Sequence, residues 1–489
     1  MFRELRDGLS WAFVAGFGIN FAWTSSVFFH SLLFTSAGHS FTFSNFYLAS
    51  MAVLIVSLAL MGVCFPVARK SFQKPPALVC AGIMLLVGTY GAANASFDGL
   101  PGIACFWAGV LFTGFGSAFM LGLWGWFLGT KVKTPAANMC AAYLLATPLY
   151  FLLSLLPASI TVAVVGLLPA LSLWVYFSFG RNTDDLPSMA KRTDAEAAEA
   201  LFPARCAAAD GEGANSPAPE ASPIPRISIA AVLAGVVLSL MNYTPSGDGP
   251  SNFTFALYFL LASAVPLVCF LLYFQAYKGR SSAADRLVMA YRIAVLVMVG
   301  SVLLSIAIMD RNLAFQEIAL AGYICLKMVF WSLFAALSRT AKLSPITIFC
   351  FGEGCLTAGL FIGNQISSVL GLQFASATAA LTLAILLATY MFALPERKMY
   401  AMMQEQEDDD EPRHQRFRAR CEEIAAAYKL SRRETEVFTL FARGRSSSRI
   451  ADDLYVSSGT VSTHLRNIYR KLDVHSRQEL LDLIEGAGE

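Results

Sequence analysis

Long apolar stretches alternate with short polar segments along most of this chain. Each stretch has about the 20 residues that a helix needs to cross a bilayer. The stretches lie near residues 11–34, 46–67, 77–95, 103–128, 137–156 and 160–179, and then near 227–243, 253–277, 288–309, 314–337, 346–370 and 374–394. The pattern predicts an all-α, polytopic membrane helix bundle with six spans in each half.

Polar segments interrupt this pattern in two places. Residues 181–226 are rich in Pro, Ser, Ala and acidic side chains, a composition typical of a disordered linker. Residues 395–426 carry an acidic run and then a basic run, which indicate a charged tether. Either this tether is simply solvated, or its basic part lies against anionic lipid or DNA phosphates. The predicted domains are therefore a first membrane half at 1–180, the linker, a second membrane half at 227–394, the tether, and a C-terminal domain at 427–489.

The C-terminal domain contains a short stretch with two unlike faces. Apolar side chains recur there at i, i+4, i+7 and i+11, at Val461, Leu465, Ile468 and Leu472. This spacing predicts an amphipathic helix with one face in a core. The other face holds Thr463, Arg466, Asn467 and Arg470 and no carboxylate. Such a face suits a helix that lies in the major groove of DNA and touches bases and phosphates.

The neighbouring residues predict further helices. Capping boxes at Ser431–Glu434 and Ser476–Glu479 each mark a helix start. Gly444 ends the first of these helices, and residues 450–454 form a short helix just before the amphipathic one. The spacing is that of a helix-turn-helix, with a fourth helix behind it at residues 478–485.

This region resembles the LuxR-type DNA-binding domain. The matching residues include Leu430, Ser431, Glu434, Val437, Gly444, Ile450, Ala451, Thr460, Val461, Ile468, Lys471, Leu472 and Val474. The resemblance implies binding to DNA as a homodimer, and it places Ser462, Thr463 and Arg466 at the interface. We expect Asn467, Arg470 and Lys471 to belong to the same surface. The family usually has Lys where this chain has Ser462. The alternative interpretation of the whole region is a small helical bundle that docks onto another protein.

Composition indicates a membrane protein, and the motifs of the sequence do not indicate an enzyme. Hydrophobic residues make up 56% of the 489 residues and charged residues 14%, against about a quarter charged in soluble domains. The ten Cys residues form no CxxC pair and lie far from His, so we expect no metal site. Nothing resembles a nucleophile or nucleotide site, so we expect neither an enzyme nor a cofactor. No cleavage site ends the first apolar stretch, which we interpret as a retained span.

The distribution of Lys and Arg predicts the orientation. The turns after spans two, four, eight and ten carry basic residues, whereas the alternate turns hold only Arg311. Basic loops stay in the cytoplasm. We therefore expect a multi-pass protein of the cytoplasmic (inner) membrane with both termini, the linker and the C-terminal domain inside. The basic residues of these turns are Arg69, Lys70, Lys74, Lys131, Lys133, Lys278, Arg280, Arg286, Arg339 and Lys342.

Six plus six spans around a long middle loop resemble the major facilitator superfamily, whose two halves are repeats around a central site. The loop motif that the family carries between spans two and three is present only in part. Gly62 and the pair Arg69-Lys70 match it, but Pro66 and Ala68 replace its Asp and its second Gly. A degraded transport motif is expected if the fold senses a ligand and no longer transports one.

Ionisable residues within spans are costly and so are candidates for function. Glu317, Lys327 and Glu353 are such residues, and Lys327 and Glu353 lie at similar depth in neighbouring spans. We expect these two to pair, either as a structural ion pair or in a ligand-binding or proton-coupled role.

Other residues of the spans are weaker candidates. Asn20, Trp23 and His30 share the first span and are candidates for a ligand pocket. Gly359 and Gly363 form a small-xxx-small pair, which predicts close helix packing.

The sequence thus predicts a membrane-bound one-component transcriptional regulator. A small molecule is sensed by the membrane domain, and the C-terminal domain binds promoter DNA. Nothing between the last span and the helix-turn-helix is long enough for a phosphoacceptor domain. The alternative is a secondary transporter with an appended regulatory DNA-binding domain. The expected partners are DNA, a small-molecule ligand, membrane lipid and a second copy of the chain.

Overall fold

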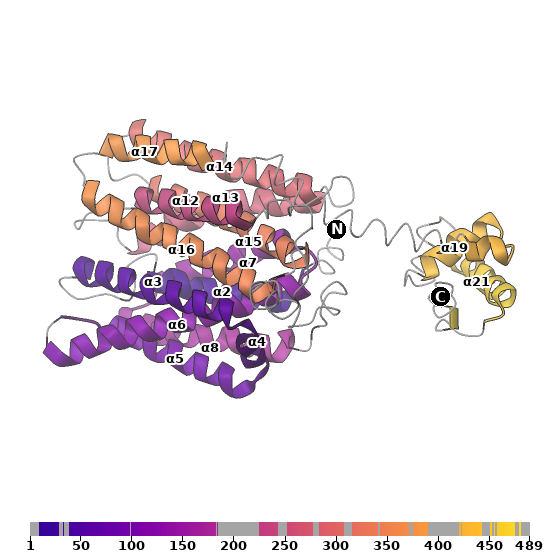
Figure 1. Cartoon of the computed structure of the whole chain (residues 1–489), viewed down its shortest axis with the longest axis horizontal. Coiled ribbons are helices and arrows are strands. Elements are labelled where there is room, and N and C mark those ends of the chain that lie inside the picture. Colours follow the sequence, from indigo (N-terminus) through magenta and orange to yellow (C-terminus); the bar gives the residue numbers. More distant parts are fainter. Residues whose placement is uncertain are drawn as a thin grey trace, which may run out of the picture. The chain divides into compact units, whose positions relative to one another are not determined.

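The computed structural model of this protein shows helices as its regular elements throughout the part of the chain that it describes (Figure 1). It separates into two compact units, Met1–Met403 and Gln404–Glu489. The predicted linker and tether fall mostly outside the described residues. The described residues are 9–28, 33, 39–97, 99–181, 183, 224–242, 252–276, 283–307, 315–340, 343–370, 375–389, 420–421, 423–442, 450–451, 454, 457–474 and 479–480.

A helix coincides with each predicted apolar stretch, although the last of these helices has only 14 residues. The first half holds α2 (Trp11–Phe28), α3 (His39–Val63), α5 (Pro75–Ala93), α6 (Gly99–Lys131), α7 (Pro135–Ser154) and α8 (Ala158–Val175), with a short α4 (Phe65–Gln73) after α3 and a π-helical turn η1 (Tyr176–Gly180) after α8. The second half holds α12 (Ile224–Asn242), α13 (Asn252–Ala276), α14 (Ala283–Ala307), α15 (Phe315–Thr340), α16 (Pro345–Leu370) and α17 (Ala375–Ala388).

Eight segments of the described chain are long and apolar enough to cross a membrane. They include Gly99–Lys131 in the first half and Leu320–Arg339 in the second. The second of these, which belongs to α15, is 94% buried inside the protein over its most apolar part. The count of twelve spans therefore stays a prediction. The high burial of α15 sets it apart as a central helix, and a central helix can contribute to an internal site.

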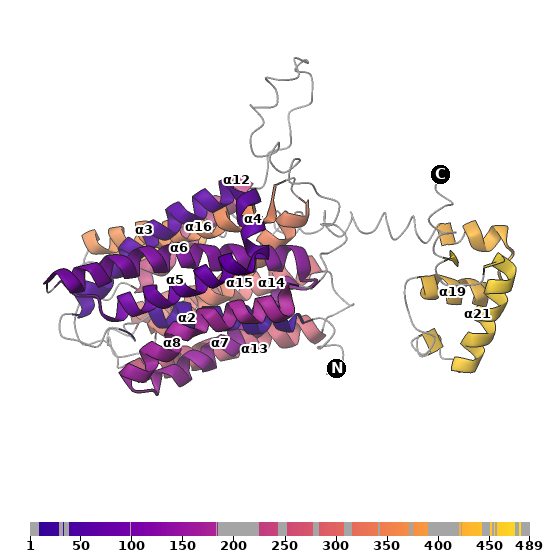
Figure 2. The ribbon, with the colours of Figure 1, turned by 90° about the horizontal axis from the view of Figure 1, so that it is seen from below.

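The two halves pack against each other through a few central helices. In the second half, α16 contacts α3 and α6, and α15 contacts α6 and α7. Figure 2 shows α3 and α16 side by side although almost 300 residues separate them in the sequence. Thr347 donates a hydrogen bond from its hydroxyl to the Gly62 carbonyl (2.8 Å), and this contact joins α16 to α3. Residues buried where the two halves meet therefore come from α3, α6, α7, α15 and α16.

Glycines allow α12 and α16 to approach unusually closely. A Cβ added at Gly359 would lie 2.0 Å from the Val232 carbonyl oxygen, and one added at Gly235 would lie 2.2 Å from that of Leu356. Only glycine fits where the backbones of two helices touch in this way. The close packing predicted for Gly359 and Gly363 is confirmed, since a Cβ at Gly363 would also meet the Val236 carbonyl oxygen at 2.7 Å.

The second unit has a hydrophobic core of its own. It contains α19 (Arg432–Ala442) and α21 (Ser458–Leu472), which pack against each other. Val437 and Phe438 of α19 and Ile450 are buried in this core together with the apolar face of α21. The capping box predicted at Ser431–Glu434 is confirmed: the Ser431 backbone N–H donates to the Glu434 carboxylate (2.7 Å), and the Glu434 N–H donates to the Ser431 hydroxyl (3.3 Å). The one predicted at Ser476–Glu479 begins outside the described residues.

Candidate DNA-binding helix and buried charge pair

The helix predicted to bind DNA is α21, and local signals fix both of its ends. Ser457 has extended backbone angles, and its hydroxyl accepts a hydrogen bond from the Thr460 N–H (3.1 Å). This contact satisfies one of the free N–H groups that every helix start has. At the other end, Asp473 adopts the left-handed conformation (φ 54°), and the Val474 N–H donates to the Tyr469 carbonyl. The helix therefore has a defined start and stop.

The two faces of α21 are as the sequence predicts. Val461, Leu465, Ile468 and Leu472 are all buried. Ser462, Thr463, Arg466 and Arg470 are exposed, and Asn467 is half-buried. The periodicity therefore separated the core face from the free face correctly.

The free face of α21 carries hydrogen-bond donors and positive charge. The Arg470 guanidinium donates to the Asn467 side-chain oxygen (3.2 Å), so these two side chains are held together. The Thr463 hydroxyl donates to the Gly459 carbonyl (3.0 Å), which leaves its oxygen able to accept. Arg466 is exposed between them. A face of this kind can contact both phosphates and base edges.

Lys471 differs from the other residues predicted to contact DNA, because its side chain is engaged inside the unit. Its ammonium donates to the Glu434 carboxylate (2.7 Å) and to the Lys429 carbonyl (3.1 Å). The Lys471 side chain is 34% exposed and that of Glu434 only 7%. Lys471 thus ties the end of α21 to the start of α19. A role for it in DNA contact stays a prediction.

In the membrane unit, Lys327 of α15 and Glu353 of α16 form the ion pair that the sequence predicts. The Lys327 ammonium lies 3.1 Å from Oε2 of Glu353, and the side chains are 13% and 3% exposed. The other carboxylate oxygen of Glu353 accepts a hydrogen bond from Nε1 of Trp331, one helical turn beyond Lys327. The Lys327 ammonium also lies 6.0 Å from the centre of the Trp331 ring. Both oxygens of the buried carboxylate are therefore paired.

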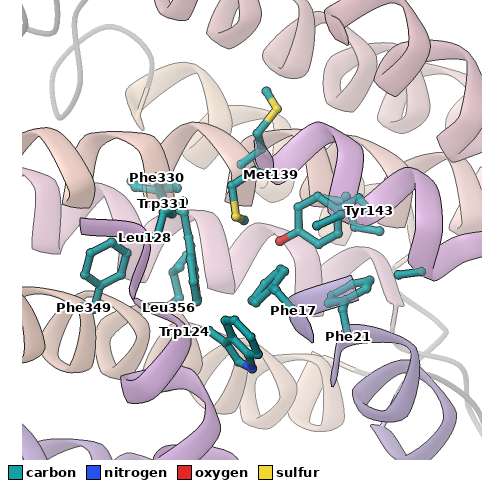
Figure 3. Packing of buried hydrophobic residues seen from close by; sticks show 14 of the residues in the cluster. Phe17, Phe21, Trp124, Leu128, Met139, Tyr143, Phe330, Trp331, Phe349 and Leu356 are labelled. Carbon is teal, nitrogen blue, oxygen red and sulfur yellow. The ribbon is translucent and has the colours of Figure 1, made fainter. Parts of the chain in front are cut away.

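Aromatic side chains from both halves surround this pair. The Phe17 ring of α2 lies 4.9 Å from the Trp331 ring and 5.8 Å from the ring of Tyr143 on α7. Phe349 packs on the other side of Trp331 at 5.3 Å. In Figure 3 the Tyr143 hydroxyl points away from Phe21, toward the side on which Phe17 and Trp331 lie. The charge pair thus sits where the halves meet, among aromatic walls.

Buried polar groups next to this cluster escaped the sequence analysis. The side-chain oxygens of Tyr143, Thr147 and Tyr150 have no hydrogen-bond partner within the described residues, although each side chain is almost fully buried. They occupy one face of α7 at i, i+4 and i+7. That spacing was a usable signal, but hydroxyl groups are common in membrane helices and their partners are invisible in a sequence. Each such group costs about 1 to 3 kcal/mol while it stays unpaired, so these groups favour a ligand or a rearrangement that pairs them.

The remaining predicted ligand residues do not gather at one point. Asn20 is buried, and its side-chain oxygen also lacks a partner within the described residues. Trp23 is buried, and its Nε1 donates to the Thr89 hydroxyl on α5 (2.9 Å), which gives it a structural partner. Glu317 falls in α15, but its side chain, like the whole of His30, lies outside the described residues. Within those residues no group of three metal-ligating side chains is found.

Comparison with known proteins identifies the C-terminal region. Residues 428–484 match the model of the bacterial regulatory proteins of the luxR family. The response regulatory protein YgeK of Escherichia coli K12, itself uncharacterized, is 45% identical over 65 residues, which are 12% of this chain and 44% of YgeK. The transcriptional regulator MalT of Yersinia pestis (strain Pestoides F) is 42% identical over 57 residues, 12% of this chain and 6% of MalT. The chain spans less than half the length of these relatives.

The membrane unit resembles a transporter in fold. A bacterial homologue of the iron transporter ferroportin, in its outward-facing state, superimposes with a TM-score of 0.51 and 11% identity, over 81% of this chain and 98% of that one. The same homologue with soaked iron gives 0.50 and 12%, over 81% and 97%. This likeness establishes a fold of the major facilitator type. The chain is a multi-pass membrane protein with a LuxR-type DNA-binding domain at its C-terminal end.

Proposed function

We propose that this chain, in which a LuxR-type DNA-binding domain is attached to a membrane domain of the major facilitator type, is a membrane-bound one-component transcriptional regulator. The membrane domain binds a small molecule, and the C-terminal domain binds promoter DNA as a homodimer on the cytoplasmic side. The observation that carries this proposal is the presence of both domains in one chain. A transporter needs no DNA-binding domain, and a DNA-binding domain needs no membrane domain, so their union in one chain points to regulation through the membrane.

The exposed face of α21 supports the DNA-binding half of the proposal. Arg466 and Arg470 give it positive charge, and Ser462, Thr463 and Asn467 give it hydrogen-bonding groups. The apolar face of the helix is buried in a core, so the polar face is the one available to a groove of DNA. Arg466 has the central position, where we expect a contact to a base edge.

The interior of the membrane domain supports the sensing half. The pair Lys327–Glu353 joins neighbouring helices of the second half, and both side chains are largely buried. A ligand that bound one member would leave the other unpaired, which costs several kcal/mol in a low-dielectric interior. A ligand can therefore shift the packing of α15 against α16, provided that it binds one arrangement better than the other.

The proposal is tested by finding the operator and then the inducer. Chromatin immunoprecipitation of the full chain identifies bound DNA, and a reporter behind that DNA is then exposed to a panel of small molecules. We expect a change in reporter output with at least one compound, and weaker DNA binding with Arg466→Ala. The matched control is Arg433→Ala, since Arg433 is an exposed arginine of the same unit on α19, paired with Glu436. Equal loss with both variants would contradict the assignment of α21.

A second candidate function is a secondary transporter whose attached domain regulates genes. The buried pair Lys327–Glu353 supports this second function, because ionisable residues within a membrane often serve ion or proton pathways. The partial loss of the loop motif at Pro66 and Ala68 argues against it. Uptake of the identified inducer into vesicles that contain the purified chain distinguishes the two, since a pure sensor binds without accumulation.

A further inference from the structure

A groove lies on the lipid-facing side of the first membrane half, between α5 and α8, which pack side by side. It has a volume of about 350 Å³ and is almost entirely apolar. It runs from Pro75 and Phe177 at one end to Leu86 and Leu167 at the other. Neither proposed function uses this groove.

The length of the groove matches one leaflet of a membrane. From Pro75 to Leu86 the helix advances by eleven residues, or about 16 Å at 1.5 Å per residue. The hydrocarbon core of a bilayer is about 30 Å thick, so one leaflet is about 15 Å deep. A single extended acyl chain of that leaflet therefore fits along the groove.

Gly82 keeps the middle of the groove open. A Cβ added there would meet its nearest neighbour, Cδ1 of Leu173, at 3.6 Å, which is an ordinary van der Waals contact. The same Cβ would lie 3.9 Å from Cα and Cβ of Ala170 on α8, so the longer side chain of a leucine would occupy the space between α5 and α8. One substitution at this buried position can thus fill the middle of the groove.

The end of the groove at Pro75 carries positive charge. Lys74 immediately precedes Pro75 and forms the N-cap of α5. On the opposite side, Arg181 follows η1, and its guanidinium carbon lies 5.5 Å from the centre of the Phe177 ring that lines the groove. Lys131 donates to the carbonyl groups of Arg181 and Thr183 and so holds this backbone in place.

Within the described part of the chain, neither Lys74 nor Arg181 is paired with a carboxylate. Both residues lie near the Pro75 end of the apolar groove. A lipid whose acyl chain lay in the groove would have its head group at that end. A negative head group gains from both cations, whereas a zwitterionic one brings a positive charge of its own.

We propose that this groove is a binding site for an anionic phospholipid. One acyl chain lies between α5 and α8 over Gly82, and the head-group phosphate lies at Lys74 and Arg181. The site is independent of the small-molecule and DNA-binding roles, and it gives the expected membrane-lipid partner a defined place on the first half.

The test uses the full chain, purified in detergent with added phosphatidylglycerol or phosphatidylcholine of identical acyl chains. Native mass spectrometry counts the lipids that stay bound. We expect phosphatidylglycerol to be retained at least about fivefold over phosphatidylcholine, because each basic residue at a membrane surface contributes about that factor. Gly82→Leu should remove this retained lipid. Gly300→Leu is the matched control, because a Cβ at Gly300 on α14 meets nothing within 4 Å.

A second pair of variants tests the charges without changing the groove. Lys74→Gln with Arg181→Gln should bring the retention of the two lipids to within about twofold of each other, whereas Lys133→Gln, which removes an exposed cation after α6, should leave the preference intact. The proposal is overturned if Gly82→Leu retains as much phosphatidylglycerol as the wild type, or if the double charge variant keeps the full preference. It is equally overturned if filling the groove dissociates an oligomer instead, because the occupant is then a second copy of the chain. Should Gly82→Leu not fold, the charge variants decide the matter.

Discussion

The Lys471 ammonium at the end of α21 lies 2.7 Å from the Glu434 carboxylate at the start of α19. The same carboxylate accepts a hydrogen bond from the Ser431 N–H, and the same ammonium donates to the Lys429 carbonyl. One ion pair thus completes the cap of α19 and fixes α21 to the loop in front of that cap. We infer that it orients the free face of α21 without belonging to it.

This ion pair predicts a loss of stability in acid. Burial raises the pKa of Glu434, but hydrogen bonds from Lys471 and from Ser431 outweigh burial and lower the pKa from an ordinary 4.5 to about 2. A depressed folded-state pKa contributes stability above the unfolded pKa, and this contribution is lost as the pH falls through the folded value. The window is therefore about pH 4.5 to 2. The Lys471 side chain is 34% exposed, so solvent weakens the pair, and we expect it to contribute about 1 kcal/mol at neutral pH, less than the full shift would imply.

Urea unfolding of a 404–489 fragment at pH 7, 4 and 3 checks this prediction, since that unit has its own core. Glu434→Gln should lower the stability at pH 7 and flatten the loss between pH 4.5 and 2. Glu436→Gln is the control, because Glu436 forms a pair with Arg433 that is far more exposed. If both variants show the wild-type slope, other carboxylates cause the acid sensitivity.

DNA binding should separate Arg466 from Lys471. Arg466→Ala should weaken operator binding by about 1 to 3 kcal/mol if the residue contacts a base. Lys471→Met should lower the unfolding free energy of the fragment, and its DNA affinity should be nearly normal under conditions where it is fully folded. Gel shifts with folded protein, assayed by circular dichroism, measure both. A wild-type DNA affinity of Arg466→Ala would contradict the role given to Arg466. A large loss of DNA affinity in folded Lys471→Met would contradict the structural role given to Lys471.

Local patterns in the sequence predicted the parts of the site that depend on a single helix. The period of Val461, Leu465, Ile468 and Leu472 revealed the buried face of α21 because all four positions lie on the same helix. The role of Lys471 was not visible, since its partner Glu434 lies 37 residues away on another helix. A basic residue on an amphipathic helix has the same sequence signature whether it binds a phosphate or a neighbouring carboxylate.

In the membrane unit, the depth of a residue along its span was predictable from the sequence, whereas the rotation of each helix about its own axis was not. Counting residues along each span gave Lys327 and Glu353 similar depths, and they do pair. The bond from Trp331 to Glu353 depends on how α15 and α16 are turned toward each other, which residue counting does not reveal. The same holds for Tyr143, whose place beside Phe17 depends on the packing of α7 against α2.

The contact between α12 and α16 predicts a sharp difference between two glycines of the same helix. At Gly359 an added Cβ would lie 2.0 Å from the Val232 carbonyl oxygen, whereas at Gly354 the nearest atom is 3.9 Å away. Gly359→Ala should therefore force the helices apart and cost about 1 to 3 kcal/mol. Gly354→Ala should be neutral or slightly stabilising, since alanine favours a helix over glycine by up to about 1 kcal/mol. Thermal unfolding of the purified full chain compares them, and equal melting temperatures would contradict the close approach.

The last prediction concerns the pair Lys327–Glu353 and its partner Trp331. Glu353→Gln keeps an oxygen that can accept from Trp331 but leaves the buried ammonium without its counter-charge, at a cost of about 3 to 5 kcal/mol. Exchanging the two charges is a poorer test, because it would place an ammonium opposite the Trp331 N–H, donor against donor. Replacing both members, as Lys327→Met with Glu353→Gln, removes both charges and should restore much of the stability lost in the single variant.

Stability and signalling should then separate in this double variant. Melting temperature and membrane abundance report whether the fold is restored, and the operator reporter reports whether induction survives. We expect a stable protein without induction, because the charges on which the ligand acts are gone while the helices still pack. If induction returns together with stability, the pair only holds α15 to α16. The next groups to replace are then the hydroxyls of Tyr143, Thr147 and Tyr150 on α7, which have no hydrogen-bond partner in the described part of the chain, by Tyr→Phe and Thr→Val changes.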